Sequence, residues 1–469
     1  MTLRSPLSLR AASASRAPTL VACCAAVLTG ALVAAPAARA SPSEGPAPRA
    51  IVVRYAARVS RADGALAHDA RLLQPVAAPR TRVVRLRPGV GLTGELRRLR
   101  AQRDVVWAVP DYIAHAAGGL VPNDPGMGGA VKGWEQLQWN FAGQFGVDAP
   151  DAWANLAAAG APGGKDVTVA VLDTGVAYAD RGRFRRSPDF GRFQFVHGYD
   201  FVAKNRFPND RNGHGTFVAA TIAEATNNRY GLTGLAYGAR IMPVRVLDSG
   251  GEGEASTIAK GVVFAARHGA QVINLSLEFS PGVTASDIPE LIDALRYAHR
   301  RGVLVVGAAG NEGHTAIAYP ARAPYVISVG ATTEHGCLAA YSNDGSSLTL
   351  VAPGGGPDAD LPSDPNCHPE LPSGRDIFQV TFSGSSPRAF GIPSGYEGTS
   401  MATPHVTATA ALIIASRVLG RHPSPAQITA RLRATARKLG GGGDERLYGA
   451  GLVDAAAATT RGGPGAVAG

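Results

Sequence analysis

The 469-residue chain has little that would tie it to a membrane. Apart from one N-terminal stretch, about Thr19 to Ala35, no apolar run is long enough to span a bilayer, which takes about 20 residues. Arg4, Arg10 and Arg16 precede this stretch, and Ala38-Arg39-Ala40 follows it as a small-x-small cleavage site. The pattern predicts a secretory signal peptide over residues 1–40 and therefore a secreted, extracellular protein.

Cysteine is scarce, with four in the chain. Cys23 and Cys24 lie in the predicted signal peptide, where Leu20-Val21-Ala22-Cys23 also resembles a lipoprotein box that falls early in the apolar run. Cys23 as a lipid anchor is therefore a competing interpretation. Cys337 and Cys367 remain, an even number in an exported chain, which predicts a disulfide between them. The alternative is two independent buried thiols.

A basic excess is missing from most of the chain, although the total net charge is +10. Residues 1–40 hold four arginines and no acid, and residues 41–120 hold 13 basic and 6 acidic side chains. Residues 121–469 are left with a net charge of −1. Because the excess of basic side chains lies in segments that we expect to be removed, no nucleic-acid partner is indicated.

The first 120 residues contain a small α/β pattern. Residues 41–49 are rich in Pro, Ala and Ser and resemble a linker. Strands are predicted at Ile51–Tyr55, Thr81–Leu86 and Val105–Val109, and an amphipathic helix at Leu92–Ala101. A unit of this size is marginal when alone. The Gly/Pro-rich stretch Gly118 to Gly133 then predicts an exposed linker.

The larger part alternates short apolar runs with helical patterns. Strands are predicted at Val167–Leu172, Arg240–Leu247, Ala270–Leu275, Val303–Val306 and Tyr325–Val329. Helices are predicted at Ser256–His268 and Ile288–Arg301, and the long apolar run Val406–Ala415 predicts a buried helix. Such alternation favours a parallel sheet covered on both faces. Functional side chains then belong at the carboxyl ends of the strands. Residues 461–469 are predicted to be a loose tail.

Four polar residues lie just after a predicted strand or at the start of a predicted helix. Asp173 follows the first predicted strand and precedes Thr174-Gly175. His214 lies between glycines at a helix start, and Asn311 follows a buried strand. Ser400 precedes the apolar helix, where unpaired N–H groups favour developing negative charge. Taken singly, each has an ordinary interpretation as a turn residue, a loop histidine or a helix cap.

Taken together, their order Asp, His, Asn, Ser resembles the subtilisin-like serine peptidase family (subtilases). The resemblance rests on Val171-Leu172-Asp173-Thr174-Gly175, Asn212-Gly213-His214-Gly215-Thr216, Ala309-Gly310-Asn311 and Gly398-Thr399-Ser400-Met401-Ala402. It covers roughly residues 134 to 455. It implies a three-layer α/β fold with a mostly parallel sheet, as a peptidase domain over residues 121–460.

The resemblance also implies a serine endopeptidase that acts on polypeptides through an acyl-enzyme. Ser400 would attack the peptide carbonyl and His214 would carry the proton. Asp173 would hold the imidazole tautomer. The Asn311 amide and the Ser400 N–H would form the oxyanion hole.

Substrate contacts are implied at Gly251, Gly253, Ser276, Leu277, Glu278, Ala309, Gly310 and Ala318. The Gly251-Glu252-Gly253 stretch resembles the edge strand that pairs with extended substrate. The chain departs from the family pattern at Phe217, where a second His is usual, and at Glu278, where Gly is usual. Phe217 is expected in the helix core. Glu278 either favours basic substrate residues or points to solvent, while Ala318 leaves a roomy pocket.

Residues 41–120, and in particular Ala50 to Ala116, resemble the inhibitory propeptide of the family. We expect this segment to assist folding and then to be cut off by Ser400, with the mature N-terminus between Tyr112 and Gly128. The mature enzyme is expected to be a monomer whose partners are polypeptide substrates and its own propeptide.

A structural calcium site is a further implication of the resemblance. Asp189 and the loop from Thr226 to Gly231 match it, with Gln138, Asn228, Tyr230 and Leu232 as further ligands. Carboxylate, amide and backbone oxygens suit Ca²⁺. The alternative is an ordinary polar turn.

Two other classes of protein compete with this interpretation. An α/β-hydrolase would need Ser before Asp before His and a G-x-S-x-G elbow, and the second Gly is missing because Met401-Ala402 follows Ser400. A binding protein without activity would be expected to have lost one of Asp173, His214, Asn311 and Ser400, and all four are present.

Overall fold

A computed structural model describes residues 50–56, 70–75, 80–86, 92–110, 121–127, 133–440 and 444–462. The predicted signal peptide, the lipoprotein box and most of the predicted tail lie outside these residues. Within the described ranges, no helix has both the length and the apolarity needed to cross a membrane.

The N-terminal unit is a four-stranded antiparallel sheet in the order β2-β3-β1-β4. Its strands are β1 (Ala50–Tyr55), β2 (Ala70–Pro75), β3 (Thr81–Leu86) and β4 (Val105–Pro110), with the helix α1 (Leu92–Arg100). Its core gathers around Ile51, Val53 and Leu99. Three strands and the helix match the predicted ranges, whereas β2 was not predicted.

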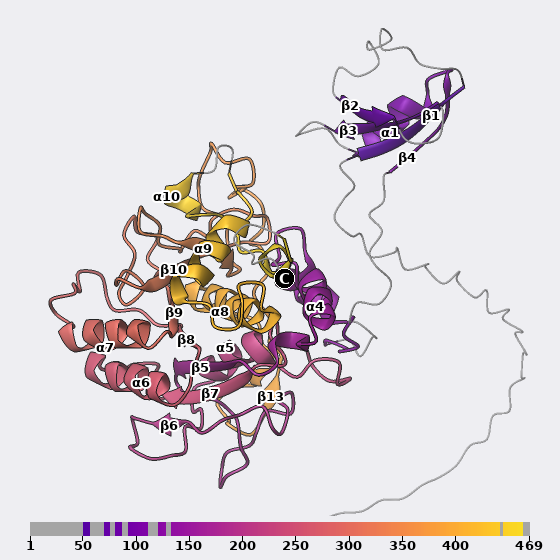
Figure 1. Ribbon diagram of the computed structural model, residues 1–469. Helices are drawn as coiled ribbons and strands as arrows, with labels where there is room; N and C mark the ends of the chain where they lie inside the picture. Colours follow the sequence, from indigo (N-terminus) through magenta and orange to yellow (C-terminus); the bar gives the residue numbers. More distant parts are fainter. Residues whose placement is uncertain are drawn as a thin grey trace, which may run out of the picture. The chain divides into compact units, whose positions relative to one another are not determined.

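A seven-stranded, wholly parallel sheet forms the centre of the larger part, in the order β11-β10-β9-β8-β5-β7-β6 (Figure 1). The strands are β5 (Thr168–Asp173), β6 (Tyr199–Asp200), β7 (Arg240–Arg245), β8 (Val272–Leu275), β9 (Leu304–Ala308), β10 (Val326–Thr332) and β11 (Leu350–Pro353). The five predicted strands are all present. β6 and β11, two and four residues long, were not predicted because such short strands carry little periodicity.

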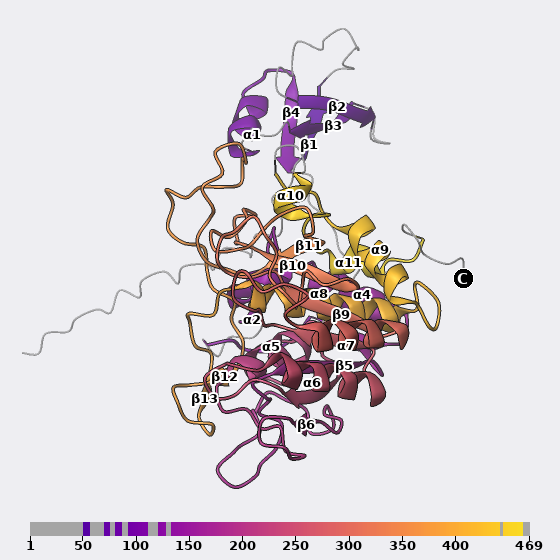
Figure 2. The same cartoon turned by 90° about the vertical axis from the view of Figure 1, so that its left-hand side faces the viewer.

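Helices cover both faces, which confirms the predicted three-layer fold. Within β5, Ala170 and Leu172 pack in the core formed with α6 (Ala255–Arg267) and α7 (Pro289–Arg300). Val169 and Val171 belong to the opposite core, formed with α4 (Ala149–Ala158), α5 (His214–Ala223) and α8 (Thr399–Ser416) (Figure 2). Neighbouring residues of a strand point to opposite faces, so each central strand supports both layers.

The remaining elements lie around this sandwich. They are α2 (Trp134–Leu137), α3 (Trp139–Ala142), the 3-10 turn Pro162–Gly164, the hairpin β12 (Thr381–Phe382) and β13 (Phe390–Gly391), α9 (Pro425–Thr435), α10 (Glu445–Tyr448) and α11 (Ala455–Thr459). Cys337 and Cys367 form the predicted disulfide, with Cα atoms 4.8 Å apart.

The stretch Gly118 to Gly133 is not an exposed linker throughout, as the sequence had predicted. The carbonyl of Pro122 accepts a hydrogen bond from Trp134 Nε1 at 3.0 Å. Asp124 is fully buried, and its carboxylate accepts the backbone N–H groups of Asn227 and Asn228 at 2.8 and 3.0 Å. Long-range polar contacts, which composition does not reveal, therefore attach this segment to the larger part.

Candidate active site

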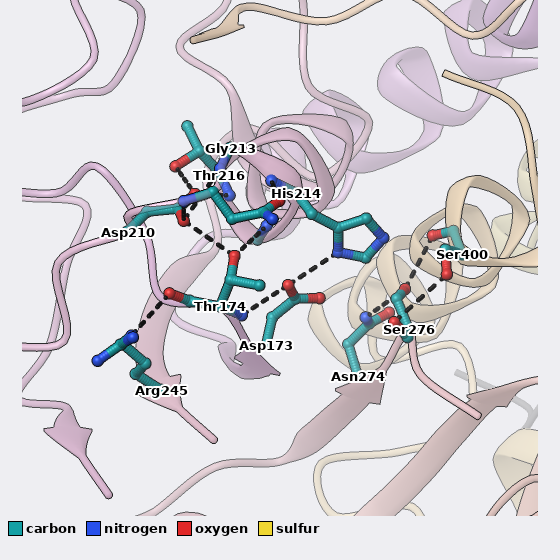
Figure 3. A network of polar contacts seen from close by, with 12 residues as sticks. Asp173, Thr174, Asp210, Gly213, His214, Thr216, Arg245, Asn274, Ser276 and Ser400 are labelled. Carbon is teal, nitrogen blue, oxygen red and sulfur yellow. Dashed lines mark hydrogen bonds and ion pairs between the residues drawn. The ribbon is translucent and has the colours of Figure 1, made fainter. Parts of the chain in front are cut away.

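Asp173 is the last residue of β5 and is fully buried. Its Oδ1 accepts a hydrogen bond from His214 Nδ1 at 2.8 Å and another from the Thr174 N–H at 2.7 Å (Figure 3). Its Oδ2 is buried and has no hydrogen-bond partner among the described residues. The carboxylate is thus held in one orientation, facing the imidazole.

His214 is the first residue of α5, and the following glycine lets the helix start lie against β5. A Cβ atom on Gly215 would be 2.2 Å from Gly175 O and 2.9 Å from Asp173 Oδ1. Only glycine fits this approach, as the flanking glycines had suggested.

Three residues after His214, Phe217 is fully buried and stacks on Tyr396 with ring centroids 4.1 Å apart. The prediction that Phe217 lies in the core is confirmed.

Two opposing effects set the pKa of His214. Burial lowers it, because the imidazolium is poorly solvated there. The charge of Asp173 and the hydrogen bond to it raise the pKa, and the net result lies above the ordinary value of 6.5. With Nδ1–H donating to Asp173, Nε2 is left free to accept a proton.

Asp210 supports this loop and was not singled out from the sequence. Its carboxylate accepts hydrogen bonds from the Thr174 and Thr216 hydroxyls at 2.9 and 2.6 Å, and from three backbone N–H groups, those of Asn212, Gly213 and Thr216 (Figure 3). It therefore links the end of β5 to the start of α5. Its place four residues before His214 was the available signal, because Asp often closes such turns.

Ser400 is the second residue of α8, and it is the one residue of that helix that is not buried. The residue before the helix, Gly398, has φ 146° and ψ 163°, a conformation closed to other residues. The placement at a helix N-terminus is as predicted. No hydrogen bond joins Ser400 Oγ to His214 in the part of the chain that the structure describes. Instead Oγ donates to Ser276 O at 3.3 Å.

Ser276 and Ser400 share a second hydrogen bond, and Pro404 is the reason for it. Pro404 is the sixth residue of α8, and it has no N–H to donate to the carbonyl of Ser400 four residues earlier. Ser276 Oγ donates to that carbonyl at 2.8 Å (Figure 3). The start of α8 is thereby tied to the residue that follows β8.

Asn311 is fixed by its carboxamide oxygen. Oδ1 accepts the backbone N–H of Thr399 at 2.8 Å and the Thr399 hydroxyl at 3.0 Å. The amide Nδ2 therefore points the other way, where it donates to Glu278 Oε1 at 2.9 Å. Glu278 also accepts the Asn311 backbone N–H at 3.1 Å through Oε2. Glu278 thus turns toward Asn311, and the alternative that it points to solvent is wrong.

Most of the predicted substrate-contact residues come together beside Asn311. Ala318 N donates to Ala309 O at 2.8 Å, so these two segments are adjacent. Glu278 borders them through its bonds to Asn311, and Ser276 is bonded to Ser400. Gly251 and Gly253 do not form the expected edge strand. They lie in or beside a turn in which Asp248 N donates to Glu252 O at 2.8 Å. Three glycines within four residues favour this turn over an extended strand.

The residues proposed for calcium are only partly assembled as expected. Asn228 Nδ2 donates to Asp189 Oδ1 at 2.7 Å, and Leu232 N donates to Asp189 Oδ2 at 3.0 Å. Tyr230 lies in the same loop, where its N–H donates to Asn228 Oδ1. Gln138 is bonded elsewhere, to both backbone groups of Thr233. Among the residues described, no group of three or more His, Cys, Asp or Glu is placed to hold a metal ion.

The interior beside this loop nonetheless holds more carboxyl groups than the sequence had suggested. Asp124, Asp189 and Glu224 are all fully buried. Burial, and then their mutual repulsion, raise the pKa values of Asp189 and Glu224. Glu224 Oε2 has no partner among the described residues. Buried carboxylates of this kind are relieved by a proton or a cation, so the residues present fit a cation once the Asn228 carboxamide turns its oxygen inward.

Comparison with known proteins gives four consistent matches. The model of the Subtilase family matches residues 164–451. Subtilisin BL of Lederbergia lenta is 39% identical over 298 residues, covering 63% of this chain and 91% of the relative. Thermitase of Thermoactinomyces vulgaris is 34% identical over 322 residues, covering 69% and 94%. A solved protease structure from Pseudoalteromonas arctica matches with a TM-score of 0.58 at 30% identity, covering 72% of this chain and 99% of that one.

Proposed function

The chain belongs to the subtilase family and is a serine-type endopeptidase, and we propose that it cleaves peptide bonds with Ser400 as the nucleophile, His214 as the proton carrier and Asp173 as the group that holds the imidazole. The observation that carries the residue assignment is the 2.8 Å bond between His214 Nδ1 and the buried carboxylate of Asp173. It selects the tautomer in which Nε2 can accept a proton.

Acylation begins when the Ser400 hydroxyl leaves Ser276 O and turns to His214 Nε2. Ser400 Oγ then bonds to the scissile carbonyl carbon, while its proton passes to Nε2. Collapse of the tetrahedral intermediate breaks the C–N bond, and His214 returns the proton to the amine. Water repeats the sequence on the acyl-enzyme. Asp173 stays ionised and stabilises the imidazolium. A hydrogen bond between catalytic groups that forms only with substrate is common in such enzymes.

Charge on the carbonyl oxygen develops where Asn311 Nδ2 and the Ser400 N–H can donate. The Thr399 bonds to Asn311 Oδ1 support this role, because they hold the amide in place before substrate arrives. The second donor belongs to the N-terminal turn of α8, whose dipole favours the same negative charge. We propose Ser276, Leu277, Glu278, Ala309, Gly310 and Ala318 as the walls that meet the substrate, with Gly251 and Gly253 beside them.

We further propose that the protein is secreted as a zymogen. In this scheme residues 1–40 are a signal peptide, residues 41–120 a propeptide that folds against the enzyme, and residues 121–460 the peptidase domain. Because Pro122 and Asp124 are bonded into the larger part, we place the cleavage between Tyr112 and Leu120, upstream of part of the range expected from the sequence. The product is a monomer that acts on polypeptides.

Calcium is proposed as a structural ion near Asp189. Asp189, Glu224 and Asp124 would supply carboxylate oxygens, and Asn228, Tyr230 and Leu232 would supply amide or backbone oxygens. Gln138 is left out because its carboxamide is already paired with Thr233. The ion supplies no chemistry to the reaction. It would offset the repulsion of the buried carboxylates and fix the loop after α5.

The proposed function is tested with Ser400→Ala. This variant should bind peptide and melt at the parent temperature, while its kcat falls about 10⁶-fold, as it does for the equivalent change in subtilisin. Ser385→Ala, on an exposed loop, is the matched control and should keep full activity. In the parent, a serine-directed phosphonate should add to one residue, found by mass spectrometry. An adduct on a residue other than Ser400, or an active Ser400→Ala, would refute the assignment.

A further inference from the structure

Glu278 occupies the donor that the reaction needs. Its carboxylate is bonded to Asn311 twice, through Nδ2 at 2.9 Å and through the backbone N–H at 3.1 Å. Nδ2 carries two N–H groups, so an oxyanion bound by the second one would lie beside the Glu278 carboxylate on the same nitrogen. The two negative charges would repel each other at this distance, so the intermediate is stabilised fully only when Glu278 leaves Asn311.

A second acidic side chain, that of Glu312, lies beside Glu278. A Cβ atom built on Gly310 would be 2.6 Å from Glu278 Oε2 and 3.0 Å from Glu312 Oε2, so both carboxylates border the same small volume. Glu312 is held there by Asn343 Nδ2 at 2.7 Å. No ion pair joins either glutamate to a basic side chain among the described residues. Burial and the nearby Glu312 raise the pKa of Glu278, which reflects the missing positive charge.

The substrate side chain nearest to Glu278 follows from the chemistry. The oxyanion is the carbonyl oxygen of the residue on the N-terminal side of the cleaved bond, called P1. The P1 Cα is bonded directly to the attacked carbon, so its side chain begins within a few ångströms of Asn311 Nδ2. A carboxylate that leaves Nδ2 is therefore within reach of a P1 side chain, and a cation there gives it a new partner.

We propose that Glu278 makes the enzyme select substrates with lysine or arginine at P1, because a P1 cation draws the Glu278 carboxylate off Asn311 and so completes the oxyanion hole. The inference rests on the proposed roles of Ser400 and Asn311. A neutral P1 residue leaves Glu278 bonded to Asn311. Displacing Glu278 then costs binding energy, because its carboxylate gains no cationic partner in exchange. The preference for lysine or arginine at P1 should therefore appear in kcat as well as in KM.

Four peptide p-nitroanilides that differ only at P1 test the proposal: lysine against its neutral analogue norleucine, and arginine against citrulline. The parent should prefer the cation in each pair by about 10- to 100-fold in kcat/KM. In Glu278→Gln the preference should fall to within about threefold, because the rate for cationic substrates drops and that for neutral substrates rises. Glu290→Gln, an exposed acid on α7, removes the same charge elsewhere and should keep the parent preference.

Other outcomes overturn the proposal. If the parent cleaves norleucine as fast as lysine, or if Glu278→Gln keeps the preference, Glu278 is not the determinant. Titration of Ser400 with the phosphonate separates this failure from failure of the proposed function. A chain that is labelled at Ser400 and hydrolyses all four substrates equally refutes only the P1 inference. A chain that is neither labelled nor active refutes the function itself.

Discussion

Ser276 and Ser400 hold each other through two hydrogen bonds that run in opposite directions. Ser276 Oγ donates to Ser400 O at 2.8 Å, and Ser400 Oγ donates to Ser276 O at 3.3 Å. The first bond exists because Pro404 leaves the Ser400 carbonyl without its helical donor. The second holds the proposed nucleophile away from His214 until substrate binds. The pair thus sets both the position and the resting state of Ser400.

Removing the Ser276 hydroxyl should destabilise the enzyme by about 1–3 kcal/mol, because a buried carbonyl loses its donor. In a Pro404→Ala background the new N–H can serve Ser400 O, so Ser276→Ala should then cost about 1 kcal/mol less. Urea unfolding of the parent, both single variants and the double variant gives this coupling energy. Equal costs of Ser276→Ala in the two backgrounds would show that Pro404 is not the reason for the bond.

The acid limb of the pH–rate profile should lie above pH 6.5. His214 must be neutral to accept the Ser400 proton, and Asp173 raises its pKa above that ordinary value against the effect of burial. Activity is therefore present above the raised pKa and lost as the pH falls through it. In Asp173→Asn only the smaller effect of the Asp210 charge still opposes burial. The limb should therefore move to lower pH, while kcat falls by about 10⁴. A limb that stays in place in Asp173→Asn would rule out this electrostatic coupling.

Asn311→Ala should lower kcat by about 10²–10³ with little change in KM, the loss known for the same donor in subtilisin. Thr399→Val removes the hydroxyl that fixes Asn311 Oδ1 and keeps the backbone bond, so a smaller loss of about threefold to tenfold is expected. Thr399→Ser keeps the hydroxyl and should behave as the parent. If Thr399→Ser and Thr399→Val lose equally, the role of Thr399 is in packing and not in orienting the amide.

Calcium should raise the melting temperature of the mature enzyme. An ion that binds only the folded chain adds about 2.7 kcal/mol at a hundredfold excess over Kd. Calorimetry in excess EDTA and in millimolar CaCl₂ measures the effect. Asp189→Asn should lose the response, whereas Gln138→Glu should keep it because Gln138 pairs with Thr233. An identical melting curve with and without the chelator would remove calcium from the proposal.

Ser400→Ala should accumulate as a proform that begins near Ser41, whereas the parent loses the propeptide between Tyr112 and Leu120. N-terminal sequencing of both proteins decides this. No lysine or arginine lies in that stretch, so the P1 preference argued for Glu278 works against self-cleavage there. Glu278→Gln is therefore expected to mature faster than the parent. If Ser400→Ala is trimmed at the same bond in a protease-deficient host, another enzyme performs the step.

Residues that act through their immediate neighbours could be predicted from the sequence. Asp173 follows an apolar strand, and Ser400 precedes an apolar helix, so the local pattern was enough for their placement. The three-layer fold followed from the alternation of strands and helices. Side-chain direction could not be predicted in this way. Glu278 turns toward Asn311, which is 33 residues away in the chain, and no local signal contains that contact.

The same limit applies to the supporting carboxylates. Asp210 reaches back to Thr174, 36 residues earlier, and Asp124 meets the Asn227 N–H across 103 residues. Such bonds form only once the chain is folded. For this reason the calcium ligands implied by the resemblance include Gln138, whereas the set that we propose from the contacts contains Asp124 and Glu224. It is also why the sequence predicts an exposed linker over Gly118 to Gly133, a stretch in which Asp124 is bonded to the larger part.

The position of α8 near the C-terminal end of the sequence has a consequence for how the enzyme folds. This helix packs on β8, β9, β10 and β11, and its Ser400 meets Ser276 from 124 residues away. Contacts that close such long loops form slowly, and in a parallel sheet they wait for the crossover helices. Asp173 and His214, 41 residues apart, can meet much earlier. Proteolytic activity is therefore among the last properties the chain gains as it folds, so half-folded copies do not digest one another while their backbones are exposed.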